Sequence, residues 1–281
     1  MCEFCHEHGE GKKWYLQAKN YSEDLMSDVR RRKFIEEFVT HPEELAHKAQ
    51  SFDRLAKTPR LVRSIVARMV SRKMKKQHFG QVVPIEEIEQ IFGFVNSIVR
   101  MDCICRHRFM GKEKRYCYGV SMAPNGGMIA DLCRTVDKSF YAGPDTSGLE
   151  TVTKEEAISA LRDYEKEGLC HTVWTFQTPF IAGVCNCDRA DCLAMRSTVT
   201  EAVPVMFRGE YVAEVNPEDC SGCRQCMRVC QFGAMTHSAS SNKTVVDQRW
   251  CYGCGVCRSA CNKNAIKLTD RSKVPAVASL W

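Results

Sequence analysis

Residues 220–230 read CSGCRQCMRVC, and residues 251–261 read CYGCGVCRSAC. Both stretches follow the spacing C-x2-C-x2-C-x3-C, which indicates an internal duplication. Three cysteines at this spacing can wrap a tight loop around one cubane iron–sulfur cluster, with each thiolate on a different iron. The fourth cysteine lies on the following helical turn, too far round to complete the same site. The repeat therefore predicts two [4Fe–4S] clusters that exchange their fourth ligands.

This region resembles the bacterial two-[4Fe–4S] ferredoxins. The likeness extends to QFGAM (231–235) and KNAIKL (263–268), where that family has an alanine followed by an apolar strand. The family has proline after each fourth cysteine, whereas Gln231 and Asn262 follow here, which removes no ligand. Zinc knuckles fit poorly, because zinc sites do not require eight thiols in an interleaved repeat. The resemblance implies one cluster on Cys220, Cys223, Cys226 and Cys261, and another on Cys251, Cys254, Cys257 and Cys230.

The chain has eighteen cysteines in 281 residues, which fits either a secreted disulfide framework or a set of reduced metal ligands. The N-terminal stretch MCEFCHEHGEGKK has no apolar core of the kind that a secretory signal needs. No later run approaches the roughly 18 apolar residues of a membrane span. We therefore expect a cytoplasmic protein with reduced cysteines and no transmembrane segment.

A second group of cysteines precedes the repeat. In an extended segment, residues i and i+2 point the same way, so each C-x-C pair could present two thiolates to one side. We expect the two pairs, from distant segments, to converge on a shared metal site. CICR (103–106), GLCH (168–171) and CNCDRADC (185–192) resemble a group of larger ferredoxin-type proteins from anaerobes, over roughly residues 83–281. That resemblance implies no particular reaction. The members of this group, all candidate metal ligands, are Cys103, Cys105, Cys117, Cys133, Cys185, Cys187 and Cys192.

Seven cysteines do not divide into two four-thiolate sites. Either one cluster forms and some thiols are spare, or two form and one takes an eighth ligand from Cys170, His107, His171 or a substrate. The interpretation that we favour is one or two additional iron–sulfur clusters; a zinc site with four thiolate ligands and unligated buried thiols are the alternatives. Arg106 would then be a structural or hydrogen-bonding partner of the cluster.

The leader CEFCHEH (2–8) is open to three interpretations. Its C-x-x-C-H pattern matches the attachment motif of c-type haem, which is disfavoured because that attachment takes place outside the cytoplasm. Alternatively, Cys2, Cys5, His6 and His8 complete a metal site with ligands from elsewhere, or the leader is disordered.

The pattern along the chain predicts an α+β protein. We expect a Cys/His-rich leader (1–20), a helical basic region (21–82), a small mixed α/β cysteine-rich domain with an additional metal cluster (83–202) and a ferredoxin-like two-[4Fe–4S] domain (203–281). Caps at Ser22, Thr40 with Glu43, and Thr58 predict three helices before Gln77.

Further elements are expected in the later domains. A helix and then a strand should fill 84–100, loops 116–147, and a hairpin 203–215. A capping box at Thr153 and Glu156 should begin a helix that ends at Gly168, followed by a strand.

Positive charge is concentrated in one stretch. Residues 54–84 contain nine Lys or Arg and no Asp or Glu, so the rest of the chain carries a formal charge of −3 out of a total of +6. In the third helix, Leu61, Val62, Ile65, Val66, Met69 and Val70 form an apolar stripe. We expect this helix to pack by that stripe and expose its basic face. Docking of an acidic redox partner is the next interpretation, ahead of peripheral membrane contact; no motif favours nucleic acid.

No phosphate-binding glycine loop, dinucleotide fingerprint or Ser/His/Asp signature occurs. The sequence favours an iron–sulfur electron-transfer protein, or such a subunit of an anaerobic oxidoreductase complex, whose partner is an acidic protein such as a ferredoxin or flavodoxin. The alternative is an iron–sulfur enzyme or reductive activator whose incompletely ligated middle cluster binds substrate.

Overall fold

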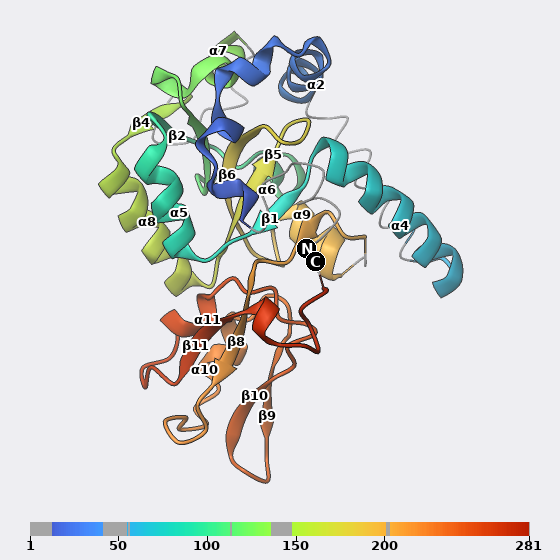
Figure 1. Cartoon of the computed structure of the whole chain (residues 1–281), viewed down its shortest axis with the longest axis vertical. Coiled ribbons are helices and arrows are strands. Elements are labelled where there is room, and N and C mark those ends of the chain that lie inside the picture. The colour runs from blue at the N-terminus through green and yellow to red at the C-terminus, as the bar shows by residue number, and fades with distance from the viewer. Residues whose placement is uncertain are drawn as a thin grey trace.

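The computed structural model describes residues 13–41, 55, 57–112, 114–135, 148–200 and 203–280. The chain is an α+β protein. A larger part is built on one mixed sheet with helices around it, and a smaller C-terminal part lies below it in Figure 1. The leader cysteines Cys2 and Cys5, the leader histidines and the cap residue Glu43 lie outside the described residues.

The sheet of the larger part has seven strands in the order β4-β2-β3-β6-β5-β1-β7. Neighbouring strands are antiparallel, except that β1 and β7 are parallel. The strands are β1 (Gly80–Val82), β2 (Ser97–Met101), β3 (Cys117–Ser121), β4 (Glu150–Val152), β5 (Cys170–Thr175), β6 (Ile181–Cys187) and β7 (Met206–Phe207).

Two helices, α5 (Ile85–Phe94) and α8 (Lys154–Glu167), cover one face of the sheet with the 3-10 turns η1 (Trp14–Leu16) and η2 (Ala18–Tyr21). The predicted capping box of α8 is confirmed: Thr153 accepts from the Glu156 amide, and Glu156 accepts from the Thr153 amide. Gly168 ends the helix with φ 90°, as predicted. Leu161 and Tyr164 of α8 pack into the core with Ile88 of α5. The helix and strand predicted over 84–100 are α5 and β2.

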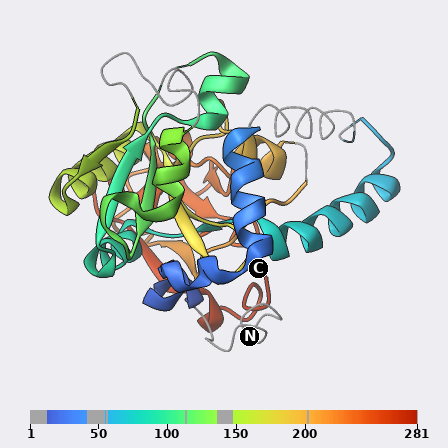
Figure 2. The same ribbon diagram turned by 90° about the horizontal axis from the view of Figure 1, so that it is seen from above.

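The opposite face is covered by α2 (Val29–Thr40), α7 (Gly127–Thr135) and α9 (Leu193–Val199). Figure 2, seen from above, shows α2 and α7 over the sheet and α4 (Arg60–Gln77) extending away from the body. Short elements complete this part: η3 (Glu23–Ser27), α6 (Ile104–Met110) and η4 (Pro124–Gly126). Ser22 is an N-cap, as predicted, and accepts from the amide of Asp24, but it begins only the 3-10 turn η3. The α-helix α2 begins later, with Asp28 as its cap.

The C-terminal part contains two antiparallel strand pairs and two short helices. Strand β8 (Tyr211–Val215) pairs with β11 (Ile266–Asp270), and β9 (Met235–Ser238) pairs with β10 (Lys243–Val246). The helices are α10 (Gln225–Val229) and α11 (Val256–Ser259), and the turn η6 (Arg271–Lys273) follows β11.

The two parts share a core. Phe232 and Tyr252 of the C-terminal part stack at 4.0 Å and belong to the same apolar cluster as Trp174 of β5. At the junction, Gly209 donates its amide to the Tyr252 carbonyl at 2.8 Å. The buried carboxylate of Glu87 accepts from the Tyr211 hydroxyl at 2.9 Å. The dicluster region is therefore packed against the sheet rather than tethered to it.

Three predictions of local structure are wrong. Residues 116–147 are not all loop, because β3, η4 and α7 form within them. Residues 203–215 do not form a hairpin: β7 pairs with β1, and β8 pairs with β11, because both find partners distant in the sequence. Thr58 does not cap α4 but turns its hydroxyl to the Leu55 carbonyl.

The apolar stripe of α4 also differs from expectation. Only Ala67 of this helix is buried, while Leu61 and Met69 expose 74% and 66% of their surface. The predicted domain boundaries stay predictions, although strands β1 and β7, which belong to the sheet, lie on either side of the 83–202 segment. Among the helices that the structure describes, none is long and apolar enough to cross a membrane.

Candidate functional site

The two cysteine repeats have the same local structure. In each, a loop carries the first cysteines and turns into a one-turn helix, α10 or α11. The residue before the helix, Arg224 or Gly255, has a positive φ of 65° or 83°. This left-handed conformation reverses the chain sharply, so that the loop curves around a space rather than filling it.

Two cavities lie beside these loops. Each is lined by four cysteines, three from one repeat and the fourth from the other. The first set is Cys220, Cys223, Cys226 and Cys261; the second is Cys230, Cys251, Cys254 and Cys257. Four thiols around one apolar space fit a cubane, which takes one thiolate on each iron. The residues present thus suit two [4Fe–4S] clusters, and the assignment of each ligand stays a prediction.

Backbone amides point at several of these sulfurs. The amides of Ala234 and Ala213 donate to Cys230 and Cys251 at 3.3 Å, and the amide of Thr244 donates to Cys220 at 3.5 Å. Burial alone would raise the pKa of Cys220, but the amides of Thr244 and Gly222 outweigh it and lower the pKa. These donors favour the thiolate form, which is the form that binds iron.

Comparison with known proteins agrees with this geometry. Residues 219–266 match the family described as the 4Fe-4S dicluster domain. This segment is a 4Fe–4S dicluster domain. This domain fits iron–sulfur electron transfer, because [4Fe–4S] clusters carry single electrons.

Similar segments occur in two larger enzymes. The archaeal-type glutamate synthases [NADPH] of Thermotoga maritima and of Thermotoga sp. strain RQ2 are each 33% identical to this chain over 57 residues. The match covers 20% of this chain and 11% of each enzyme, so the chain spans about a tenth of the length of the curated relatives it matches.

A second concentration of thiols lies on the sheet of the larger part. Cys117 of β3 is directly opposite Cys185 of β6, and Cys187 of β6 is opposite Cys170 of β5. Because side chains alternate along a strand, these four thiols lie on one face. They lie on the face that carries the second apolar cluster, which includes Cys187 and Cys170.

Two helix starts bring further thiols to this face. Cys103 is the residue before α6, Cys105 lies within it, and Cys192 precedes α9. The sulfur of Cys103 is 3.3 Å from that of Cys117, and the thiols of Cys105 and Cys187 interact with that of Cys192. We call this set the six-thiol group: Cys103, Cys105, Cys117, Cys185, Cys187 and Cys192. The prediction that Cys103 and Cys105 form an extended fork is wrong, because Cys105 is helical.

Among the side chains that the structure describes, Arg106 is a buried cation beside the six-thiol group. Arg106, 2% exposed, donates to the sulfur of Cys103 at 3.5 Å and to the carbonyl of Asn186 at 3.1 Å, and forms an ion pair with Asp188. Its guanidinium also lies over the ring of Tyr116, 4.7 Å from the ring centroid. Arg106 therefore ties α6 to the end of β6 and places a positive charge beside the thiols.

Neighbouring thiols and burial together set the protonation of this group. Burial raises the pKa of Cys103, whereas the neighbouring thiols of Cys105 and Cys187 lower the pKa of Cys192. One guanidinium cannot balance several thiolates, so their joint ionisation needs a bound cation. Within the described residues, no group of three or more His, Cys, Asp or Glu side chains is arranged to hold a single metal ion.

The other candidate ligands lie around this site. Cys170 is fully buried next to it, and its thiol interacts with that of Cys254 of the dicluster domain. His107 pairs with Asp102. His171 lies on the opposite face of β5 from the thiols and contacts Asn186 at 2.5 Å, and burial lowers its pKa to about 4. Cys133 is buried on α7.

Sequence reasoning missed the polar residues that support the thiols. Asp102 accepts from the amides of Cys103 and Lys114, and Tyr116 donates its amide to the sulfur of Cys103 at 3.1 Å. Asp102 and Asp188 each stand directly beside a cysteine motif, which was the available signal. Tyr116 carried no signal, because its contact depends on the folding of distant segments.

Proposed function

We propose that this chain is an electron-transfer protein or an electron-transfer subunit of an oxidoreductase complex, with a further iron–sulfur cluster on the six-thiol group. The observation that carries the proposal is the convergence of six thiols from four separate elements on one buried face. Unligated, such a group would be an oxidation hazard beside iron. Bound to iron, the thiolates are charge-compensated and the face becomes a redox centre.

In this role, the dicluster domain exchanges single electrons with a partner, and the six-thiol group supplies a third centre within the same body. Figure 1 shows the C-terminal part directly below the sheet. The shared apolar core of Phe232, Tyr252 and Trp174 keeps water from this boundary, which favours electron exchange between fixed centres.

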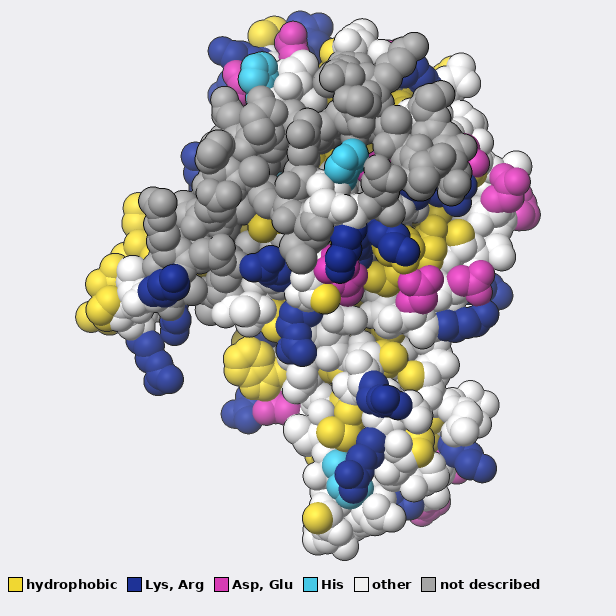
Figure 3. Space-filling model, turned by 180° about the vertical axis from the view of Figure 1, so that it is seen from behind, with side chains coloured by type: hydrophobic (Ala, Val, Ile, Leu, Met, Phe, Trp, Pro, Cys, Tyr) yellow, Lys and Arg dark blue, Asp and Glu magenta, His cyan; other side chains and the backbone are white. Residues whose placement is uncertain are grey.

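The docking surface that we propose for the partner is α4. Leu61, Val62, Ile65 and Met69 are exposed on this helix. The exposed basic side chains beside them are Arg60, Arg68, Arg72, Lys73 and Lys76. Figure 3 shows hydrophobic side chains at the projecting end of the helix, with Lys and Arg next to them. An apolar patch with a basic rim suits an acidic electron donor of the ferredoxin or flavodoxin kind.

The iron and sulfide content of anaerobically purified protein tests the proposal. Two cubanes correspond to ~8 iron and ~8 sulfide per chain, and a third raises both to ~12. We expect ~12. A content of ~8 iron with one zinc per chain would overturn the third cluster and leave an electron carrier with two centres.

A further inference from the structure

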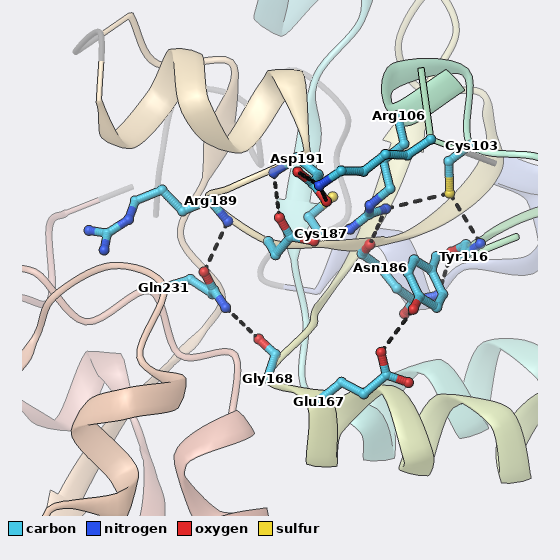
Figure 4. A network of polar contacts seen from close by, with 12 residues as sticks. Cys103, Arg106, Tyr116, Glu167, Gly168, Asn186, Cys187, Arg189, Asp191 and Gln231 are labelled. Atoms are coloured by element: carbon cyan, nitrogen blue, oxygen red, sulfur yellow. Dashed lines mark hydrogen bonds and ion pairs between the residues drawn. The ribbon is translucent and has the colours of Figure 1, made fainter. Parts of the chain in front are cut away.

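Gln231 links the dicluster domain to the sheet. It follows Cys230 directly, and its side-chain amide makes two hydrogen bonds across the boundary. Its Nε2 donates to the carbonyl of Gly168 at 2.8 Å, and its Oε1 accepts from the amide of Arg189 at 2.9 Å. Figure 4 shows Gln231 between these two residues. One side chain thus fixes two loops of the sheet to one cluster loop.

Both loops lead to buried thiols. Arg189 lies between Cys187 and Cys192, two members of the six-thiol group. Gly168 lies two residues before Cys170, whose thiol interacts with that of Cys254. Cys254 lines the same cavity as Cys230. The Gln231 contact therefore joins the surroundings of one centre to the surroundings of the other.

A second chain of contacts runs from the six-thiol group to Gly168. The amide of Tyr116 donates to the sulfur of Cys103 at 3.1 Å, and its hydroxyl donates to Glu167 at 2.8 Å. Glu167 immediately precedes Gly168. Figure 4 shows these residues in one network with Gln231. Covalent and hydrogen bonds thus connect the two sites without a gap at the boundary.

The packing around this boundary is close. A methyl group added to Gly168 would lie 3.5 Å from Gln231 Nε2 and from the side chain of Val229. On the same side of the domain, Ser259 donates to the Glu165 carbonyl at 3.2 Å, and Arg258 pairs with Glu86 at 2.7 Å. These contacts hold the domain in one orientation, and the Gln231 contact reaches the segment between Cys187 and Cys192.

We propose that this boundary is the route by which one electron passes between the Cys230/Cys251/Cys254/Cys257 cluster and the six-thiol centre, with Gln231 as its positioning residue. The inference rests on the proposed function, since it needs a centre at the six thiols. In each transfer, one centre is oxidised and the other reduced by one electron, and no bond forms or breaks. Gln231 acts by keeping the loops in contact and binds no iron itself.

The second repeat provides a matched control. Asn262 follows Cys261 as Gln231 follows Cys230, and it is exposed. Gln231→Leu keeps the size of the side chain but removes both hydrogen bonds, whereas Asn262→Leu makes a comparable change at the equivalent position. Both variants should retain the iron content of the wild type, because neither residue is a ligand.

The experiment follows one-electron reduction of the full chain by a substoichiometric pulse of dithionite, with freeze-quench electron paramagnetic resonance. In Gln231→Leu we expect several-fold slower equilibration between centres and a weaker magnetic interaction between them when both are reduced. The amide of Arg189 should exchange its hydrogen about fivefold faster, since it loses one hydrogen bond worth about 1 kcal/mol. Asn262→Leu should behave as the wild type.

Equal equilibration rates in Gln231→Leu and Asn262→Leu, at ~12 iron per chain, would overturn the route and leave the third cluster standing. A wild type with ~8 iron would overturn the third cluster, and the route with it. Iron analysis of the same samples separates these two failures.

Discussion

At the scale of single residues, the strand register decides which thiols meet. Cys117 lies opposite Cys185 only because β3 pairs with β6 at that register, and its sulfur is 3.3 Å from that of Cys103. A shift of one residue would turn each thiol of the strand to the opposite face. The site therefore depends on pairing across the sheet as much as on cysteine content.

Replacing two of these thiols tests their role. In the double variant Cys185→Ser, Cys187→Ser, we expect the loss of ~4 iron per chain, one cubane, while both dicluster signals survive. The reason is that the two residues supply the β6 side of the six-thiol group and none of the lining of the two dicluster cavities. Iron analysis and electron paramagnetic resonance provide the measurement.

Full retention of iron in this double variant would show that Cys185 and Cys187 bind no cluster. The same samples address the alternative function of an enzyme with an open site. A closed relay should keep its spectrum when cyanide is added; a shift that occurs in the wild type and vanishes in the double variant would favour the enzyme instead.

At the scale of elements, α4 differs most from its expected role. The sequence predicts that its apolar stripe packs and its basic face is solvated, but Leu61 and Ile65 are 74% and 54% exposed. Periodicity reveals that a stripe exists, and it does not reveal what covers it. The helix instead carries apolar and basic side chains together on its outer surface.

Charge reversal on α4 tests docking. Changing Arg68, Arg72 and Lys76 to Glu should slow electron transfer from an acidic donor several-fold at low salt and flatten its salt dependence. Exposed charges act over a Debye length of about 8 Å at physiological ionic strength, so they accelerate the encounter of the two proteins. Stopped-flow kinetics at several salt concentrations measures both effects. An unchanged rate at low salt would exclude α4 as the docking site for the acidic donor. Retention of the wild-type protein on anionic lipid vesicles would favour peripheral membrane contact instead.

At the scale of the whole molecule, the junction between the sheet and the dicluster domain is built from backbone as well as side chains. A methyl group on Gly209 would lie 2.7 Å from the Val82 carbonyl oxygen and 3.2 Å from that of Tyr252. Arg271 also donates to the Gly209 carbonyl at 2.9 Å. Since backbone atoms cannot move aside as a flexible side chain can, only glycine fits here.

Gly209→Ala should therefore destabilise the protein by about 1–3 kcal/mol through overpacking. The measurement is the thermal midpoint under anaerobic conditions with iron content held equal. Gly93→Ala is the control: it lies in α5, where a methyl group would lie 3.5 Å from the end of Lys154, an ordinary contact. It should stabilise the helix, because alanine has the higher helix propensity. An equal midpoint in Gly209→Ala and wild type would mean that the junction is looser than its contacts indicate.

The dicluster domain, the capping box of α8 and the α+β class could be predicted from sequence alone. Each depends on residues close together in the chain: the spacing within CSGCRQCMRVC, or Thr153 and Glu156 three residues apart. The seven cysteines upstream could be named as candidates, and the two C-x-C segments could be expected to converge, but the full grouping could not be derived. Cys103, Cys117, Cys187 and Cys192 come from four elements, and sequence contains no signal for the register that joins them.

Tertiary structure alone decided the rest. It brought Cys170 against Cys254, turned Gln231 to Gly168 and Arg189, and left the stripe of α4 uncovered. These outcomes depend on contacts between residues far apart in the chain, whose geometry is fixed only when the sheet, its helices and the C-terminal part pack together. Ligand spacing is local and so survives in the sequence, whereas burial and domain contact belong to the folded chain as a whole.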